Sequence, residues 1–313
     1  MKIISREEIL KVLPDIDLIP AIEEGFVAYS TGKATVPPVG ELLLEKGEVH
    51  IKYGYISDEP YYVVKIASGF SGNPKIGLPT GNGLMLLFSQ ATGEPVSVLL
   101  DEGYLTEIRT AVAGAIAAKY LAPSMVRKIG IVGTGMQARL QLRYLEEIVD
   151  CREVLVWGRS EENLAKYRSE MEPRGFEIQA TREAGRILHE CNFIVTATPA
   201  KEPVLLSKDL QPGTHITAMG SDTPEKQELD TGILKKTDLV VADSIPQCLL
   251  RGEIFKALEA GAIMQDDLVE LGNIISGSVP GRTSDDQVTV ADLTGVAVQD
   301  IKIATAVYEA CSE

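Results

Sequence analysis

Hydrophobic and polar positions change their spacing along the chain, and each change predicts a different kind of structure. Up to about residue 35 they repeat with helical spacing and predict helices over 6–13 and 22–29. Between 36 and 100, short apolar runs alternate with turn residues, which predicts strands over 49–56, 61–67, 84–88 and 96–100. Consecutive strands joined by tight turns indicate an antiparallel or mixed sheet.

The rest of the chain alternates strands with helices. We expect an alanine-rich helix over 105–121, and then apolar strands over 129–132, 154–157, 176–179, 193–197, 215–219 and 239–242. A strand over 287–292 and a closing helix over 296–308 complete the pattern. This alternation predicts an α/β fold with a parallel sheet.

Composition limits the classes of partner. The 313 residues carry a formal charge of −15, which argues against nucleic acid or an anionic membrane as a partner. Charges at Lys2 and Arg6 come too early for a secretory signal, and Lys119 interrupts the longest run of small apolar residues, 111–121. We therefore expect a soluble, cytoplasmic protein.

Cysteine and histidine positions give no sign of a metal site. The four cysteines lie far apart without a CxxC pair, so we interpret them as reduced, mostly structural thiols. No metal-ligand spacing joins the three histidines, which we expect to be structural: His50, His189 and His215.

A glycine-rich turn follows the apolar run 129–132. Gly133 would permit a tight turn, Gly135 would let the backbone approach a pyrophosphate, and Ala138 lies in the helix that begins there. The free N–H groups at that helix start favour phosphates. Because the motif lies between a predicted strand and a predicted helix, it indicates a dinucleotide-binding βαβ unit.

The second strand of this unit indicates which dinucleotide. An acidic residue usually ends that strand in NAD sites and binds the ribose hydroxyls. Here the strand 154–157 ends in Gly158, Arg159 and Ser160. An arginine and a hydroxyl suit a 2′-phosphate, so NADP(H) is favoured and NAD(H) is the alternative.

Two cations occupy positions where charge is unfavourable. Lys65 lies on one strand face with Val63 and Ala67, so it either reaches outwards from a sheet edge or meets an anion in a cleft. If Thr106 caps the following helix, Arg109 lies in its first turn, which favours a shared anion such as a substrate carboxylate. If the helix starts earlier, a surface ion pair is the better interpretation.

Asp222 follows the predicted strand 215–219. Ligands of open α/β sheets bind at the carboxyl ends of the strands, which makes Asp222 a candidate catalytic residue. The alternative is an ordinary turn residue. The segment 223–225 reads as a cap, a proline and an acidic residue, and predicts that a helix begins there.

Taken together, these segments resemble the ornithine cyclodeaminase/μ-crystallin family over nearly the whole chain. The resemblance is carried by 64–68, 77–80, 105–111, 133–138, 220–229 and 292–300. It implies a Rossmann dinucleotide-binding domain, residues 121–292, inserted into a strand-rich α+β domain of residues 1–120 and 293–313. The latter would bind the substrate and form a homodimer.

The family's enzymes transfer hydride between a nicotinamide and the Cα of an amino or imino acid. The resemblance implies that Lys65 and Arg109 hold the substrate carboxylate, with Lys65 also near the reacting nitrogen. Thr80 would line the same pocket, and Asp222 would be the general acid/base. It also implies a set of cofactor contacts: Gly133, Thr134, Gly135, Met136, Gln137, Ala138, Arg159, Ser160, Thr196, Ala197, Thr198, Gly220, Ser221 and Thr294.

Two departures from the family pattern concern the substrate. An arginine often follows the first proline-rich turn, but here 37–43 contains none, and Lys52 on the next strand is the candidate replacement; the alternative is a solvent-facing lysine. Glu225 stands where glycine is usual. The expected function is an NAD(P)H-dependent oxidoreductase. The alternatives are a cyclodeaminase that uses NAD⁺ catalytically and a non-enzymatic NADPH-dependent ligand binder.

Overall fold

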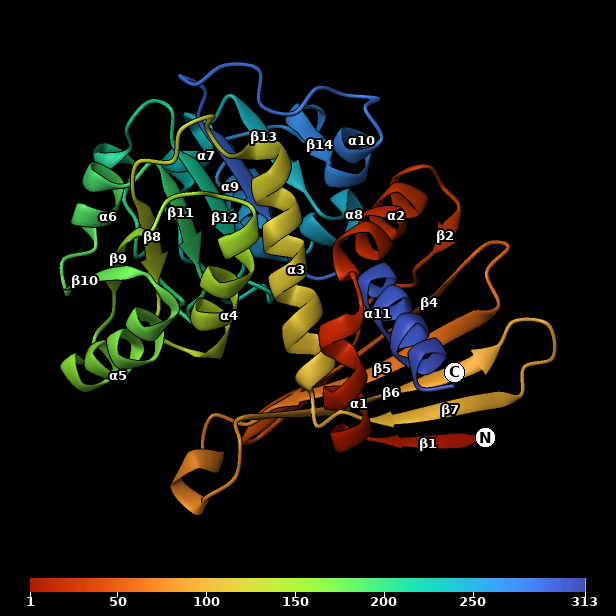
Figure 1. The fold of residues 1–313 in the computed structure, drawn as a ribbon. Coiled ribbons are helices and arrows are strands. Elements are labelled where there is room, and N and C mark those ends of the chain that lie inside the picture. Colours follow the sequence, from red (N-terminus) through yellow and green to blue (C-terminus); the bar gives the residue numbers. More distant parts are fainter. Residues whose placement is uncertain (313) are drawn as a thin grey trace. The chain divides into compact units, whose positions relative to one another are not determined.

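The computed structural model describes residues 1–312 and divides into two compact units. The first consists of Met1–Val112 with Val296–Glu313, and the second is Ala113–Gly295. The chain therefore leaves the first unit, builds the second and returns. Figure 1 shows this return in the colours of the ribbon, because the blue helix α11 (Ala297–Ala310) lies among the red and orange elements of the first unit.

The first unit is built on a mixed sheet. Within the described residues it has seven strands in the order β1-β7-β6-β5-β4-β2, with β3 paired to β4. The β1–β7 pair is parallel and the others are antiparallel. The strands are β1 (Lys2–Ser5), β2 (Ala34–Thr35), β3 (Gly40–Leu44), β4 (Gly47–Ile56), β5 (Tyr61–Gly69), β6 (Gly81–Ser89) and β7 (Pro95–Leu100).

Helices cover one face of this sheet. Alternation along the strands places Val63, Met85, Leu87 and Leu99 on that face, and each is at most 1% exposed. Helix α11 contacts β4, β5, β6 and β7 and packs along α2. Ser5 and Glu8 form a reciprocal capping box at the start of α1. The other helices of this unit are α1 (Arg6–Val12), η1 (Leu13–Asp15), α2 (Leu18–Ser30) and η2 (Asn73–Ile76).

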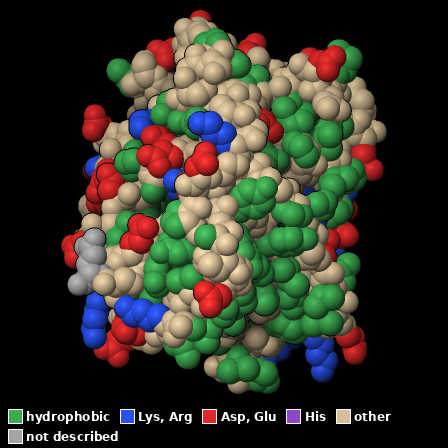
Figure 2. All heavy atoms as spheres, turned by 90° about the vertical axis from the view of Figure 1, so that its right-hand side faces the viewer, with side chains coloured by type: hydrophobic (Ala, Val, Ile, Leu, Met, Phe, Trp, Pro, Cys, Tyr) green, Lys and Arg blue, Asp and Glu red, His purple; other side chains and the backbone are tan. Residues whose placement is uncertain are grey.

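The opposite face of the sheet is apolar and open. Register places Tyr53, Val64, Leu86, Val98 and Ile3 in one row across five strands. Tyr53 is 38% exposed and Ile3 is 60% exposed. In the view of Figure 2, hydrophobic side chains gather over a broad area of the surface.

The second unit is a parallel α/β sandwich. Its sheet has eight parallel strands among the described residues, in the order β10-β9-β8-β11-β12-β15-β13-β14. Strands β8, β11, β12 and β15 are buried at every position, as expected for a sheet covered on both faces. The strands are β8 (Ile129–Val132), β9 (Glu153–Trp157), β10 (Glu177–Thr181), β11 (Phe193–Thr196), β12 (His215–Ala218), β13 (Leu239–Ala242), β14 (Leu268–Glu270) and β15 (Thr289–Asp292).

Helices connect these strands. Helix α3 (Tyr104–Leu121) starts in the first unit and ends in the second. The remaining helices are α4 (Met136–Tyr144), η3 (Leu145–Glu147), α5 (Glu161–Met171), η4 (Glu172–Arg174), α6 (Gly185–Glu190), η5 (Ser207–Asp209), α7 (Thr231–Lys235), α8 (Ile245–Cys248), α9 (Gly252–Glu259), η6 (Gln265–Asp267) and α10 (Leu271–Ile275). No helix among residues 1–312 is long and apolar enough to cross a membrane.

The predicted fold class is confirmed, because a parallel Rossmann-type sheet and a separate mixed sheet are both present. Two local predictions are wrong. Residues 223–225 do not begin a helix; they form a turn, after which Gln227 and Leu229 pair with the chain near Ala200 and Leu205. Helix α3 begins at Tyr104, so Arg109 does not lie in its first turn.

Candidate active site

The glycine turn after β8 has the geometry of a phosphate cradle. Gly133 has φ +121°, and a Cβ there would lie 2.6 Å from the carbonyl oxygen of Ala197. Its N–H donates to the carbonyl of Trp157 at 2.9 Å. Gly135 is the N-cap of α4, and nothing lies within 4 Å of the position of a Cβ. Gly133 is therefore required for the tight turn and its close contact with Ala197, while Gly135 leaves room for a ligand to approach the backbone.

A pocket of about 460 Å³ opens at this turn. It lies beyond the carboxyl ends of β8, β9 and β11, where the strand order of the sheet reverses around β8. Its volume is in the range of small-molecule sites. It is lined by Gly133, Thr134, Gly135, Trp157, Gly158, Arg159, Ala197, Thr198, Pro199, Ala200, Lys201, Glu202 and Val204.

Six of the predicted cofactor residues line this pocket: Gly133, Thr134, Gly135, Arg159, Ala197 and Thr198. Arg159 is exposed, and no carboxylate occupies the end of β9. The Ser160 hydroxyl accepts a hydrogen bond from the Asn163 N–H and caps α5. Trp157 and Lys201 were not predicted; Lys201 follows β11 in a turn-rich segment without a motif.

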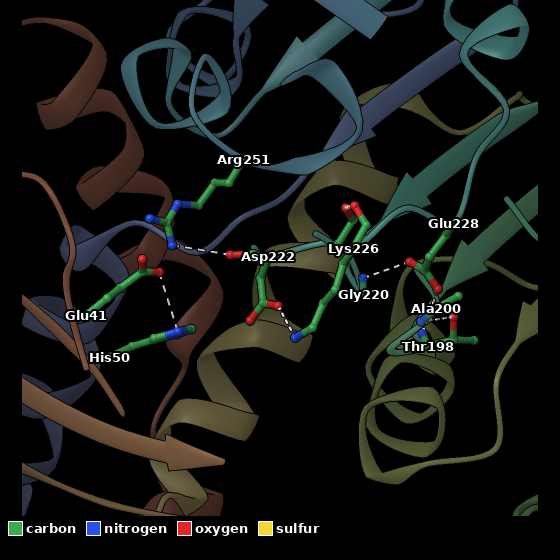
Figure 3. Close-up of polar contacts among 10 residues, drawn as sticks. Glu41, His50, Thr198, Ala200, Gly220, Asp222, Lys226, Glu228 and Arg251 are labelled. Atoms are coloured by element: carbon green, nitrogen blue, oxygen red, sulfur yellow. Dashed lines mark hydrogen bonds and ion pairs between the residues drawn. The ribbon is translucent and has the colours of Figure 1, made fainter. Parts of the chain in front are cut away.

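The other predicted cofactor residues lie outside the lining of this pocket, and several bind buried carboxylates. Glu228 accepts hydrogen bonds from the Thr196 hydroxyl at 2.7 Å and from the Thr198 and Gly220 N–H groups at 2.6 and 2.8 Å. Figure 3 shows Glu228 between Gly220 and Thr198. Thr294 donates to Asp243 at 3.0 Å. The remaining residues outside the lining are Met136, Gln137, Ala138, Ser160 and Ser221.

Burial sets the protonation of this carboxylate group. It raises the pKa of Glu228 to about 7, although the hydrogen bonds from Thr196 and Thr198 oppose the shift. Burial also raises the pKa of Glu253, whose oxygens accept from the Glu228 and Leu229 N–H groups. Glu228 thus holds together two backbone segments, the one that follows β11 and the one that follows β12.

Asp222 lies after β12 in the second unit. Its side chain is 38% exposed, and its Oδ1 accepts from Lys226 Nζ at 2.6 Å. Arg251 donates to the Asp222 backbone carbonyl at 3.3 Å. Figure 3 shows the Asp222 carboxylate directed towards Lys226, with Arg251 on the backbone side. A carboxylate can accept a proton and, once protonated, return it, so this side chain has the chemistry of a general acid/base.

Lys65 and Arg109 lie together in the first unit. Lys65 lies on β5, between β4 and β6, and is 2% exposed, so it does not reach outwards from a sheet edge. Its Nζ lies 3.4 Å from Oδ2 of Asp300, and Arg109 Nε lies 3.0 Å from Oδ1 of the same carboxylate. Arg109 is 5% exposed, so this is a buried ion pair rather than a surface pair.

The surroundings of Lys65 change its protonation. Burial lowers the pKa of Lys65 to about 7; the Asp300 carboxylate opposes this shift, and Arg109 and Lys52 add to it. Lys65 can therefore exchange a proton near neutral pH. An anion that entered beside it would favour the charged form.

The other two predicted substrate residues differ in their surroundings. Lys52 is directly opposite Lys65 across the β4–β5 pair and is 7% exposed, so it is not a solvent-facing lysine. Thr80 is exposed in the loop before β6, and its carbonyl accepts from the Phe70 N–H at 2.7 Å.

Asp300 contacts both Lys65 and Arg109 but was not predicted as a site residue. The sequence pattern could have indicated it, because Gln299 and Asp300 are polar residues on an otherwise apolar face of the closing helix.

The histidines have protein partners. His215 is buried between the hydroxyls of Thr289 and Thr217 at 2.8 and 2.9 Å, and burial lowers its pKa to about 3. His50 lies 3.5 Å from Glu41, as drawn in Figure 3, and His189 lies 3.2 Å from Asp209. Residues 1–312 contain no cluster of three or more His, Cys, Asp or Glu side chains arranged for a metal ion.

A parallel sheet with a glycine turn and a pocket where its strand order reverses defines the second unit as a Rossmann-type dinucleotide-binding domain. The chain belongs to the ornithine cyclodeaminase/mu-crystallin family, whose family model matches residues 2–313. Two solved members of the family match the whole chain, so the match includes the first unit as well as the second.

Named relatives include enzymes of two reaction classes. An uncharacterized cyclodeaminase of Sinorhizobium fredii is 40% identical over 100% of this chain and 96% of its own. The alanine dehydrogenase of Archaeoglobus fulgidus is 39% identical over 98% of this chain and 94% of its own.

Two solved structures are similar over their full length. An archaeal alanine dehydrogenase dimer with bound NAD has a TM-score of 0.92 and 37% identity, covering 100% of this chain and 96% of its own. The Thermococcus litoralis Δ1-pyrroline-2-carboxylate reductase in complex with NADH and L-proline has a TM-score of 0.92 and 29% identity, covering 100% and 98%.

Proposed function

We propose that the protein is an NAD(P)H-dependent oxidoreductase that transfers hydride between the nicotinamide and the Cα of a 2-imino or 2-amino acid. The observation that carries this proposal is the buried pair of cations, Lys65 and Arg109, which share the carboxylate of Asp300. Two buried cations on neighbouring elements suit a small anionic substrate. Relatives that are named alanine dehydrogenase and pyrroline-2-carboxylate reductase act on such substrates.

Four residues would hold the substrate and one would handle its proton. Lys65 and Arg109 bind the α-carboxylate, Lys52 adds a second cation beside Lys65, and Thr80 contributes a contact from its loop. Asp222 is the general acid/base: its carboxylate favours a positively charged iminium, and it exchanges a proton at the reacting nitrogen. Burial lowers the pKa of Lys65 to about 7, so this amine can also exchange a proton with the substrate.

The dinucleotide would bind in the pocket of the second unit. Gly133 permits the tight turn, and the backbone at Gly135 leaves room for a pyrophosphate. The nicotinamide supplies or accepts the hydride when bound. NADP(H) is favoured because Arg159 and Lys201 line the pocket, and no carboxylate ends β9. NAD(H) is the alternative, since the solved relatives hold NAD or NADH.

One assay separates the candidate functions. The protein is mixed with NADPH or NADH and either Δ1-pyrroline-2-carboxylate or pyruvate with ammonia, and absorbance of the reduced cofactor is followed. Consumption of the reduced cofactor, with formation of proline or alanine, supports the oxidoreductase. Cofactor binding without turnover of any substrate would favour the ligand-binding alternative.

A cyclodeaminase is the second candidate, because a 40% identical relative carries that name. In that reaction NAD⁺ is used and restored within one turnover, so ammonia is released without net reduction. Incubation with NAD⁺ and ornithine, followed by measurement of ammonia and proline, tests it. Ammonia release without accumulated NADH would replace the first proposal.

The open sheet face of the first unit suits a second copy of the chain. Its row of apolar side chains runs across five strands between the exposed Tyr53 and Ile3, and a solved relative is a dimer. We therefore assign dimerisation, together with substrate binding, to the first unit and cofactor binding to the second. We also propose a cytoplasmic location, because the four cysteines are free thiols, as is usual in a reducing compartment. Light scattering should give a dimer that Ile3→Glu with Tyr53→Glu disrupts; a wild-type monomer would refute this assignment.

A further inference from the structure

The first turn of α11 presents two buried polar residues to the cations of the first unit. Asp300 is 1% exposed and Gln299 is fully buried. The Asp300 oxygens lie 3.0 Å from Arg109 Nε and 3.4 Å from Lys65 Nζ. Gln299 Oε1 accepts from an Arg109 guanidinium N–H at 2.7 Å. Two adjacent residues of one helix thus hold cations from two other elements, β5 and α3.

Packing alone does not explain these residues. The neighbours Val298 and Ile301 are fully buried in an apolar environment, which a further apolar side chain would suit. Replacing a buried ion pair with well-packed hydrophobic residues is often neutral or stabilising. A buried charge network at this position is therefore better explained by a functional requirement on the two cations.

Hydrogen bonding at this cluster is incomplete. Three buried atoms of the cluster have no hydrogen-bond partner of good geometry among residues 1–312. They are the two carboxylate oxygens of Asp300 and the side-chain nitrogen of Gln299. The Asp300 contacts are therefore ion contacts with spare acceptor capacity, and the Gln299 amide keeps a donor. Asp300 therefore holds the two cations mainly by charge, which leaves their N–H groups for a further anion.

We propose that Asp300 and Gln299 are positioning residues of the substrate carboxylate site. Asp300 sets the direction of both Lys65 and Arg109, and Gln299 fixes the plane of the Arg109 guanidinium. The proposal rests on the proposed function in one respect, namely that these cations bind a substrate carboxylate. Arg109 then presents its remaining N–H groups, and Lys65 its ammonium group, in one fixed arrangement.

Asp300 also sets the charge of Lys65. The charged groups that act on Lys65 are Asp300 from α11, Arg109 from α3, Lys52 from β4 and Asp101 from the segment before α3. Of these, Asp300 is the carboxylate that contacts Lys65 within 4 Å. Removing its charge leaves Arg109 and Lys52 to favour the neutral amine, so the pKa of Lys65 falls.

Steady-state kinetics of the full-length protein test the positioning role. Asp300→Asn is expected to raise KM for the imino acid at least about tenfold and to reduce kcat less. Asp300→Glu, which keeps the charge, should recover part of this loss. Gln299→Met serves if Asp300→Asn does not fold, and should raise KM in the same way.

The control Glu24→Gln removes a partner of Lys302, also on α11, and should leave KM unchanged. An unchanged KM in folded Asp300→Asn or Gln299→Met overturns the proposal.

A second measurement does not depend on turnover. The protein is labelled with ¹³C-lysine, and the Lys65 Cε signal is identified by its loss in Lys65→Met. Its titration midpoint should fall by about one pH unit or more in Asp300→Asn and stay in place in Glu24→Gln. An unchanged midpoint in Asp300→Asn overturns the proposal even if the wild type is active. A shifted midpoint in a protein that turns over no imino acid would refute the proposed function alone.

Discussion

Arg109 and Asp300 form a buried ion pair of 3.0 Å between the helix that leads out of the first unit and the helix with which the chain returns to it. Lys65 and Arg109, the two cations proposed to bind the substrate carboxylate, therefore both contact the closing helix α11. The Rossmann-type unit lies between these two elements in the sequence, so the pair forms only when α11 packs on the first unit.

Lys65→Met should reduce kcat/KM for the imino acid at least about 100-fold, because it removes a cation from the carboxylate site. The affinity for NADPH should remain, since Lys65 lies in the first unit and the pocket in the second. Steady-state kinetics and fluorescence titration with NADPH measure the two effects. Lys46→Met, at an exposed lysine, is the control. Near-normal turnover in Lys65→Met would remove this residue from the site.

Asp222→Asn should lower kcat by about 100-fold or more if Asp222 transfers the proton, because an amide cannot act as an acid or base at neutral pH. The carboxamide keeps the shape of the side chain, so the melting temperature should change little. The comparison is Asp266→Asn at an exposed position. If kcat stays within a factor of about three, Asp222 is not the general acid/base.

Arg159→Ala should weaken NADPH binding at least about tenfold and NADH binding much less, because the arginine would contact only the 2′-phosphate. Dissociation constants for both cofactors, measured by calorimetry, give the ratio. Arg168→Ala removes an exposed arginine that pairs with Glu172 and should alter neither constant. Equal losses for the two cofactors would mean that Arg159 does not select NADP(H).

The pH dependence of kcat/KM should report Lys65. Its pKa is lowered to about 7, and the protonated form binds the carboxylate, so kcat/KM for the imino acid should fall as pH rises through about 7. Lys65 in the unfolded chain would keep its ordinary pKa, so the effect belongs to the folded protein. If kcat/KM falls at the same pH in a partly active Lys65→Arg variant, a group other than Lys65 causes the fall.

Glu228→Gln should destabilise the second unit. About one pH unit above its pKa of about 7, Glu228 is an acceptor for three donors, from Thr196, Thr198 and Gly220. A glutamine would turn its NH₂ group towards at least one of them, at a cost of about 1–3 kcal/mol. Urea unfolding measures this cost. Glu202→Gln, at an exposed carboxylate near the same pocket, should be neutral. Equal stability of Glu228→Gln and the wild type would contradict the hydrogen-bond geometry.

Much of the fold follows from the sequence because periodic apolar runs determine strands and helices directly. The runs at 129–132 and 193–197 correspond to strands that are buried on both faces, where the signal is strongest. The short edge strands β1 and β3 were not predicted, since they are partly exposed and carry mixed residues. The helix predicted at 223–225 is wrong because Glu228 and the pairing of Leu229 with Leu205 draw the chain into an extended path.

The site was predictable where a motif sets the backbone. The glycine turn led directly to the residues that line the pocket. The contacts of Asp300 depend on helix α11 packing against β5, which is a long-range contact that no local pattern contains. The hydrogen bonds of Thr196 and Gly220 to Glu228 also depend on the folded structure, because their buried N–H and hydroxyl donors need an acceptor there.

The measurement that bears most directly on the central claim is the change in absorbance of NADPH or NADH when the purified protein meets Δ1-pyrroline-2-carboxylate or pyruvate with ammonia. The account predicts that the reduced cofactor is consumed and that proline or alanine forms in equal amount. We also expect Lys65→Met and Asp222→Asn to slow this reaction at least about 100-fold. No consumption of either cofactor with these substrates, together with release of ammonia from ornithine and NAD⁺, would contradict it.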